Sequence, residues 1–325
     1  MKPVTSLLMM ITIFFCGSVN GADSPGDFVA WRENFRKEAL AAGISSKTLN
    51  TALADIPEPL AEVIERDRRQ PEFTQSLADY VAARVNEKRI DTGRKMMKRY
   101  PTWLGRVEKK HGVQRRFLVA LWGTESNFGQ YTGDFPVIAS LATLAYDGRR
   151  GAYFRGELLN ALHILDAGHI PFQQMKGSWA GAMGQCQFMP SSFRRFAVDA
   201  DGDGRIDIWN SVPDVLASSA NYLARAGWKK GQTWGRPVKL PAGFDISLAG
   251  LENSLPLSQW RFLGVKKSDG RFLPRSRMAA SLILPDGPEG PAFLVYHNFR
   301  VLLAWNRSNA FAVAVGTLAD RIGSQ

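Results

Sequence analysis

A glutamate at the end of an apolar helical segment is the first chemically informative feature of the sequence. A helix beginning near Gln114 carries one face that is apolar until its last member. The residues at positions i, i+3, i+4 and i+7 of that face are Leu118, Leu121, Trp122 and Glu125. A carboxyl group among apolar side chains loses solvation in its charged form, which raises its pKa and suits it to general acid catalysis near neutral pH. On spacing alone, a surface glutamate at a helix end is an equally good interpretation.

An acidic segment downstream has the spacing of an EF-hand calcium loop. Gly204 occupies the sixth position, where the sharp turn requires glycine, but the twelfth position is Asn210 instead of glutamate. Asp214 could supply the missing carboxylate. Oxygen ligands at this spacing favour a structural Ca²⁺ ion over zinc or iron, and the alternative is a solvated acidic turn. The candidate ligands are Asp199, Asp201, Asp203, Arg205 through its carbonyl, Asp207 and Asp214.

Composition and charge limit the class of protein. The chain has 325 residues, of which 45% are hydrophobic and 22% charged, so a mostly disordered chain is excluded. The formal net charge of +11 fits a polyanionic partner such as a nucleic acid, an anionic membrane or an acidic polymer. No arginine-rich helix, zinc finger or RNA-binding signature is present, so nucleic acid is not an expected partner.

The first 22 residues have the pattern of a signal peptide. Lys2 precedes the apolar run 7–15, which is too short to span a bilayer, and small residues follow up to Ala22. We therefore expect export to the periplasm, with an uncleaved apolar segment as the alternative. Lipidation of Cys16 is disfavoured because the bulky Phe15 precedes it. Removal of the segment leaves Cys186 as the single cysteine, which we interpret as a packed free thiol.

The remaining elements must position these residues. Helical periodicity dominates residues 23–108, with one block expected from about 73 to 97, and it returns from Ser308. Between about 232 and 291, Pro, Gly and short apolar runs such as 281–284 indicate a small region with strands. The expected division is a signal peptide (1–22), an N-terminal helical region (23–108), a catalytic core (109–233) containing the acidic loop (199–214), a small β-containing region (234–291) and a C-terminal segment returning to the core (292–325).

Four motifs occur in an order that resembles one enzyme family. LWGTESNFG at 121–129 is similar to the catalytic glutamate segment of lysozyme-like lytic transglycosylases. GSWAGAMGQCQFMPSSF at 177–193 resembles the second signature of the B-type family. The acidic loop (199–209) and ANYL at 220–223, followed by Gly227-Trp228, complete the series. The resemblance spans about 120 residues strongly and most of the mature chain weakly. It implies a mainly α fold with a lysozyme-like core.

The family resemblance implies a specific reaction. Such enzymes cleave the β-1,4 bond between N-acetylmuramic acid and N-acetylglucosamine in peptidoglycan, and the muramoyl 6-hydroxyl forms a 1,6-anhydro product. By motif, Glu125 is the acid and base, and Ser178 and Gln187 contact the acetamido group and the attacking hydroxyl. Phe188 and Tyr222 match aromatic walls of the sugar cleft, and Tyr80 aligns more loosely with a family tyrosine near the glutamate. Trp305 and Asn306 begin a segment, 305–311, that resembles the closing motif of the family. Trp305 departs from the tyrosine that usually begins the closing motif, and Phe311 lacks a hydroxyl.

Two other functions remain open at this point. A lysozyme-type hydrolase would act on the same bond but needs a second carboxylate. The nearest acids in the sequence, Asp134, Asp147 and Glu157, could reach Glu125 only through the fold. A non-catalytic, Ca²⁺-stabilised wall-binding protein would not need the glutamate. The anionic sacculus accounts for the basic charge, and other cell-wall enzymes are candidate partners.

Overall fold

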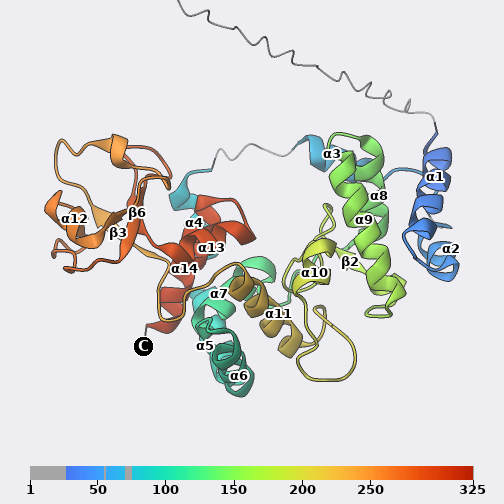
Figure 1. Ribbon diagram of the computed structural model, residues 1–325, viewed down its shortest axis with the longest axis horizontal. Coiled ribbons are helices and arrows are strands. Elements are labelled where there is room, and N and C mark those ends of the chain that lie inside the picture. Colours follow the sequence, from blue (N-terminus) through green and yellow to red (C-terminus); the bar gives the residue numbers. More distant parts are fainter. Residues whose placement is uncertain (1–26, 55, 70–74, 325) are drawn as a thin grey trace, which may run out of the picture.

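The computed structural model describes residues 27–54, 56–69 and 75–324 as an elongated, mainly helical molecule with a small sheet at one end (Figure 1). The predicted signal peptide and Cys16 lie outside the described residues. Within the described part, no helix combines the length and the apolar character needed to cross a membrane.

One group of helices forms the end of the molecule that carries the N-terminal helices. α8 and α9 pack along one another, the first three helices contact this pair, and α10 lies against α9 (Figure 1). The group consists of α1 (Phe28–Ala41), α2 (Ser46–Ala54), α3 (Ala61–Arg68), α8 (Val137–Asp147), α9 (Gly151–Asp166) and α10 (Pro190–Phe196).

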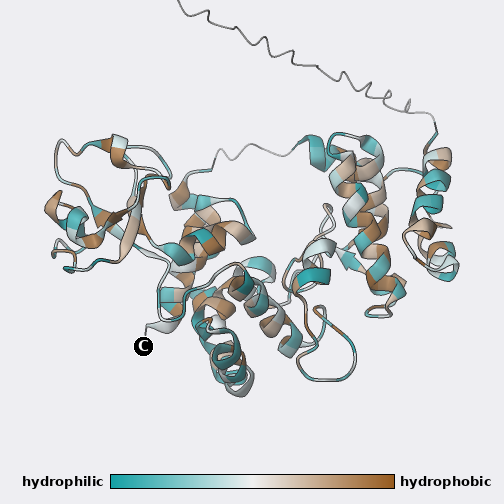
Figure 2. Cartoon of the chain, in the orientation of Figure 1, coloured by the Kyte–Doolittle hydropathy of each residue, from teal (hydrophilic) through white to brown (hydrophobic). Residues whose placement is uncertain are grey.

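A second group surrounds α7 (Arg115–Ser126) in the middle of the molecule. α14 and α5 pack directly on α7, and α11 contacts both α6 and α7. The residues 117–123 are buried without a solvent-facing side, as expected for a helix enclosed by others. The other members are α4 (Leu77–Arg84), α5 (Glu87–Arg99), α6 (Pro101–His111), α11 (Val212–Arg225), α13 (His297–Trp305) and α14 (Asn309–Gly323). α5 and α6 are mostly hydrophilic because they cover this group from outside (Figure 2).

The small sheet confirms the strand-containing region expected from the sequence. Its five antiparallel strands have the order β4-β6-β7-β3-β5, and the predicted apolar run 281–284 largely falls in β6. β7 is the central strand, with Val295 opposite both Gly235 and Ser281. The elements are β3 (Gly235–Lys239), η2 (Ile246–Leu248), β4 (Leu255–Pro256), α12 (Leu257–Phe262), β5 (Lys266–Lys267), β6 (Ala279–Ile283) and β7 (Ala292–Val295). A second core lies under this sheet, around Trp260 and Leu282.

The N-terminal helices do not all pack in one place. α1 to α3 contact α8 and α9, whereas α4 and α5 contact α7 and α14. The helical block expected over 73–97 is interrupted, because α4 ends at Arg84 and Asn86 caps the start of α5 by accepting from the backbone N–H of Arg89. Phe73, where that block was expected to begin, lies outside the described residues. The predicted domain limits stay a prediction.

Candidate active site

Glu125 lies in the last turn of α7, where the chain bends sharply. Asn127 and Phe128 adopt left-handed φ values of 50° and 61°, and Gly129 follows at 84°. A side chain on Gly123 would place its Cβ 2.6 Å from the ring of Phe128, so this helical position must lack a side chain. The ring of Phe128 thus packs closely against α7 at the turn that follows Glu125.

Burial makes Glu125 a weak acid. Desolvation raises the pKa of its carboxyl to about 7, while the hydrogen bond from Trp305 and the positive charge of Arg84 oppose the rise. The helix face predicted from the sequence is confirmed as apolar, with Leu118, Leu121 and Trp122 buried. A carboxyl with this pKa holds a proton near neutral pH and can also release it, which is the property required of a group that serves first as acid and then as base.

Trp305 is the direct hydrogen-bond partner of Glu125. Its indole Nε1 donates to Oε1 of the carboxylate at 2.6 Å. The indole also packs against Tyr222 and Phe188, with ring centroids 4.7 and 5.2 Å away. The tryptophan that departs from the family motif therefore supplies both a donor and an aromatic surface. The hydroxyl of Tyr222 points away from the carboxylate and donates to the carbonyl of Ala304 at 2.6 Å.

Arg84 is the cation beside Glu125, and no pattern in the sequence pointed to it. Its guanidinium carbon lies 3.6 Å from the ring centroid of Tyr80. Arg89 donates to the carbonyl of Arg84 at 2.7 Å and reaches Asn127 at 3.4 Å, so it ties the end of α4 to the end of α7. Burial raises the pKa of the Tyr80 hydroxyl, Arg84 lowers it, and the negative charge of Glu125 raises it further. Tyr80 therefore lies in the electrostatic surroundings of the glutamate, as the resemblance implied.

Gln185 is a second residue that sequence reasoning missed. Its side-chain Oε1 accepts from Trp122 Nε1, and its Nε2 donates to the carbonyl of Trp209, each at 2.8 Å. Its backbone carbonyl accepts from Ser126 Oγ at 2.9 Å, and its N–H donates to the carbonyl of Ile208 at 2.8 Å. This buried residue uses its backbone and side-chain polar groups to join the glutamate helix to the second motif and the acidic loop.

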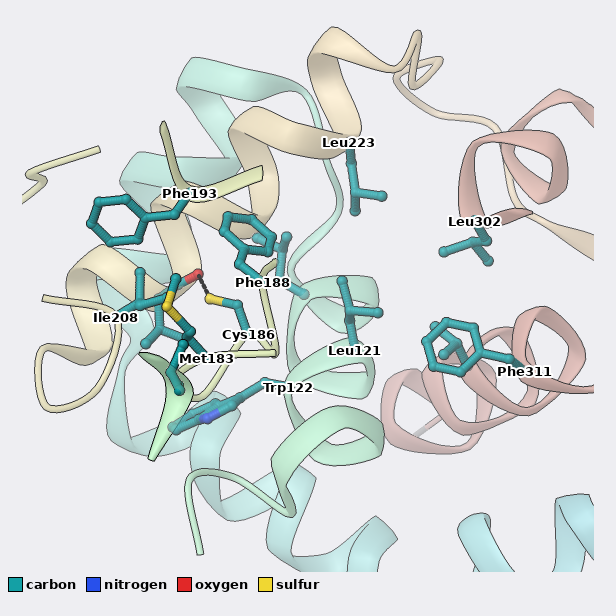
Figure 3. Packing of buried hydrophobic residues seen from close by; sticks show 14 of the residues in the cluster. Leu121, Trp122, Met183, Cys186, Phe188, Phe193, Ile208, Leu223, Leu302 and Phe311 are labelled. Carbon is teal, nitrogen blue, oxygen red and sulfur yellow. Dashed lines mark hydrogen bonds between the residues drawn. The ribbon is translucent and has the colours of Figure 1, made fainter. Parts of the chain in front are cut away.

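The second motif forms a compact turn against α7. Figure 3 shows Leu121 and Trp122 of α7 beside Met183, Cys186 and Phe188 of this motif. The thiol of Cys186 is free and buried, which confirms the packed cysteine, and burial raises its pKa to about 12. It is therefore protonated and unsuited to nucleophilic chemistry near neutral pH.

Ser178 and Gln187 stabilise neighbouring turns. β1 (Phe135–Pro136) pairs with β2 (Lys176–Gly177), and Ser178 follows β2 with its Oγ accepting from the N–H of Ala182 at 3.0 Å. Gln187 has a left-handed φ of 51°, and its Nε2 donates to the carbonyls of Thr132 and Gly184, each at 2.9 Å. The assignment of these two residues to substrate contact stays a prediction.

The closing motif divides between the site and the surface. Asn306 ends α13 with its backbone N–H donating to the carbonyl of Leu302, and the residue is exposed. Phe311 is buried in the core on α14, which begins after Ser308 as expected.

The three nearest acids in the sequence are engaged elsewhere. Asp147 forms an ion pair with Arg68 at 2.9 Å. Glu157 is buried and accepts from the N–H and hydroxyl of Ser191 at 2.8 and 2.6 Å. Asp134 lines a separate cavity beside α3. Of these candidates, none shares the surroundings of Glu125.

The acidic loop gathers only part of the predicted ligand set. Asp199, Asp201 and Asp214 have carboxylate oxygens that lie within 4.8 Å of one another. Asp214 is fully buried and accepts from the N–H groups of Ala200 and Asp207, each at 2.7 Å. Desolvation raises the pKa of Asp214, and these hydrogen bonds oppose the rise. The group has the donor chemistry of a calcium site.

The other predicted ligands lie outside that group. Asp203 accepts from the N–H of Arg205 at 2.8 Å. The carboxylate of Asp207 accepts from the N–H groups of Trp209 and Asn210, so it caps the following turn. Asp199 makes local hydrogen bonds of the same kind, accepting from the N–H groups of Gly202 and Gly204. The assignment of Asp203, Arg205 and Asp207 as ligands stays a prediction.

Comparisons with known proteins agree with this architecture. A family profile described as the transglycosylase SLT domain matches residues 27–320. Membrane-bound lytic murein transglycosylase B from Escherichia coli (strain K12) is 32% identical over 247 residues, which are 72% of this chain and 63% of that protein. The match thus spans just under two thirds of the length of this curated relative.

Solved structures are similar over most of the chain. SltB3 from Pseudomonas aeruginosa, in complex with NAG-anhNAM-pentapeptide, is 49% identical with a TM-score of 0.87, covering 90% of this chain and 78% of that one. Slt35 from Escherichia coli, in complex with calcium, is 28% identical with a TM-score of 0.77, and the match covers 94% of this chain and 97% of that one. The mainly α, lysozyme-like fold expected from the motifs is thereby confirmed, and the chain belongs to the transglycosylase SLT domain family.

Proposed function

We propose that this protein is a peptidoglycan lytic transglycosylase. It cleaves the β-1,4 bond between N-acetylmuramic acid and N-acetylglucosamine without water and produces 1,6-anhydromuramoyl ends. The observation that carries the proposal is the single carboxyl of Glu125, whose pKa is raised to about 7 beside an aromatic surface. The family membership and the anhydromuropeptide named in the SltB3 complex support the same chemistry.

In the first step, protonated Glu125 donates its proton to the glycosidic oxygen. The bond between that oxygen and the muramoyl anomeric carbon breaks, and the N-acetylglucosamine portion leaves as an alcohol. The Trp305 N–H and the Arg84 charge stabilise the carboxylate that this step creates. The aromatic surface of Phe188, Tyr222 and Trp305 provides an apolar wall on which a sugar ring can stack.

In the second step, the Glu125 carboxylate removes the proton from the muramoyl 6-hydroxyl, and that oxygen bonds to the anomeric carbon. Hydrolysis requires a second carboxyl group at about 5–5.5 Å from the first in retaining enzymes, or at about 6.5–9.5 Å in inverting enzymes. The nearest acids in the sequence are held by Arg68 and Ser191 or lie in another cavity. Because the 6-hydroxyl is tethered, its effective concentration exceeds that of a loosely held water. Ser178 and Gln187 are proposed to orient the acetamido group and this hydroxyl.

The mass of the products tests the proposal. Purified sacculi are digested, and the muropeptides are separated and weighed. We expect 1,6-anhydro ends, lighter by one water than lysozyme products. Reducing ends as the main species would replace the lyase assignment with a lysozyme-type hydrolase.

Substitution of the acid tests its assignment. Glu125→Gln is expected to lower the rate by about 10²–10⁴-fold while sacculus binding persists. Glu108→Gln on α6, which removes a surface carboxylate paired with Arg115, is the matched control and should retain wild-type rates. A Glu125→Gln variant with a third of wild-type turnover would contradict the role of this residue.

We further propose that Asp199, Asp201 and Asp214 hold a structural Ca²⁺ ion. The acidic group and the calcium complex of Slt35 support this proposal. The ion would fix the loop whose Trp209 carbonyl accepts from Gln185. The predicted signal peptide and the wall substrate place the protein in the periplasm in this proposal, with glycan strands as its partner.

A further inference from the structure

The segment 257–278 holds an unusual share of the positive charge of the chain. It contains six Lys or Arg residues and one acid, Asp269, so it contributes +5 to the formal net charge of +11. It comprises α12, β5 and the connections that follow them. Figure 1 places α12 at the end of the molecule opposite α1 and α2, away from α7. This charge is therefore not gathered around Glu125.

The same segment exposes two phenylalanines. The side chain of Phe262 is 89% exposed and that of Phe272 is 58% exposed. Among the described residues, these are the phenylalanines that face solvent. Phenylalanine has no hydrogen-bonding group that favours contact with water, so two exposed rings in one short charged segment are a candidate contact surface for an apolar partner.

Hydrogen bonds hold the charged and aromatic residues in one compact unit. The segment after Phe272 runs along α12, because Arg261 donates to the carbonyl of Leu273 at 2.8 Å and the N–H of Ser258 donates to the carbonyl of Ser276 at 3.0 Å. The Arg261 guanidinium lies 4.4 Å from the ring centroid of Phe272. Since a six-residue helix is only about 9 Å long, the cations and rings lie close together.

Most of these cations have no acidic partner. Arg271 pairs with Asp269 at 2.6 Å. Lys266, Arg275 and Arg277 are exposed and form no ion pair with any described residue. We name the following six residues the basic-aromatic tip: Phe262, Lys266, Arg271, Phe272, Arg275 and Arg277.

We propose that the basic-aromatic tip docks the protein onto an anionic phospholipid surface. Cations of the tip would contact lipid phosphates while the rings enter the boundary between headgroups and acyl chains, the usual arrangement of interfacial binding sites. Carboxylates of the peptidoglycan stem peptides would satisfy the cations, but the Phe272 ring has Arg261 and Lys266 over it, at 4.4 and 5.5 Å from its centroid, and is thus a poor stacking face for a sugar ring. A lipid surface accounts for both features. The inference is independent of the chemistry at Glu125.

Vesicle co-sedimentation tests the proposal. The mature chain without the apolar leader, residues 23–325, is mixed with vesicles of equimolar phosphatidylcholine and phosphatidylglycerol or of phosphatidylcholine alone. We expect binding to the anionic vesicles that weakens with salt. Each lost cation should weaken it about fivefold, so Arg275→Glu with Arg277→Glu should weaken it about thirtyfold or more. Phe262→Ser should weaken binding at high salt as well, because its contribution is apolar.

Matched variants on other surfaces complete the experiment. Lys109→Glu with Lys110→Glu changes the same charge at an exposed site on α6, and Leu40→Ser removes a partly exposed apolar side chain on α1. Both should bind vesicles like the wild type. All variants should cleave soluble glycan fragments at wild-type rates. The proposal would be overturned if the tip variants bound vesicles as well as the wild type does. If these variants also lost binding to sacculi while vesicle binding stayed unchanged, the tip would be assigned to the wall.

Discussion

Replacing Trp305 with phenylalanine removes the hydrogen bond that the indole donates to the Glu125 carboxylate. The bond runs from the indole Nε1 to Oε1 at 2.6 Å and opposes the effect of burial on the pKa. A hydrogen bond to a charged group contributes about 1.5–3 kcal/mol, against about 0.5–1.5 kcal/mol to a neutral one. The difference of roughly 1–1.5 kcal/mol favours the carboxylate and corresponds to about one pKa unit.

Trp305→Phe should therefore raise the pKa of Glu125 from about 7 toward about 8. A general acid works while it is protonated, so the alkaline limb of kcat/KM against pH should move upward by about one unit. At pH 7 the protonated fraction should rise from about half to about nine tenths. The phenyl ring keeps its apolar contact with Phe188 and Tyr222.

Initial rates on soluble glycan fragments, measured from about pH 5 to about pH 9, give the position of the limb. Tyr222→Phe is the matched control, because it removes a hydroxyl that donates to Ala304 and not to Glu125. Its limb should coincide with that of the wild type. An unchanged or downward-shifted limb in Trp305→Phe would refute the argument that this hydrogen bond stabilises the ionised carboxylate.

Three further predictions concern stability. Because the folded-state pKa of Glu125 is raised, the native state holds an extra proton between about pH 4.5 and about pH 7. The free energy of unfolding therefore falls as the pH rises through that window. Urea unfolding should show Glu125→Gln more stable than the wild type by up to about 3 kcal/mol at pH 8, with little difference at pH 4. Gln185→Leu leaves the Trp122 N–H and the Trp209 carbonyl unpaired, so urea unfolding should show a loss of about 2–4 kcal/mol, whereas a loss below about 0.5 kcal/mol would contradict the network. Ca²⁺ should raise the melting temperature of the wild type and of the surface control Asp91→Asn but not of Asp201→Asn; identical melting curves in Ca²⁺ and chelator would exclude the site.

Local patterns predicted the elements that carry their own signals. The helix face ending in Glu125 follows from the spacing of Leu118, Leu121 and Trp122, and the structure places it on α7. The apolar run in β6 and the return of helix near Ser308 follow equally from short-range patterns. In each case the signal lies within one short segment of the chain.

Partners that meet through the fold left no such signal. The pattern identified Trp305 as a departure from a motif, but its donation to Glu125 depends on how α13 approaches α7. Gln185 reads as an ordinary polar residue because its partners come from 122, 126, 208 and 209. Among the acidic residues, Asp207 has the spacing of a metal ligand, and the structure adds that its carboxylate accepts from the nearby N–H groups of Trp209 and Asn210. The spacing of the acidic residues shows which carboxylate oxygens are near one another along the chain, while local hydrogen bonds determine their orientation.

The contact between Glu125 and Trp305 also has a consequence for the order in which the enzyme becomes active. The two residues are 180 positions apart, so the chain segment that completes the surroundings of the acid is synthesised long after the acid itself. Contacts of such high sequence separation form late, because the entropy of closing the loop is lost before the contact stabilises anything. A partly emerged chain can form α7 but has neither the indole donor nor the aromatic wall. The proposed activity is thereby delayed until most of the molecule has folded.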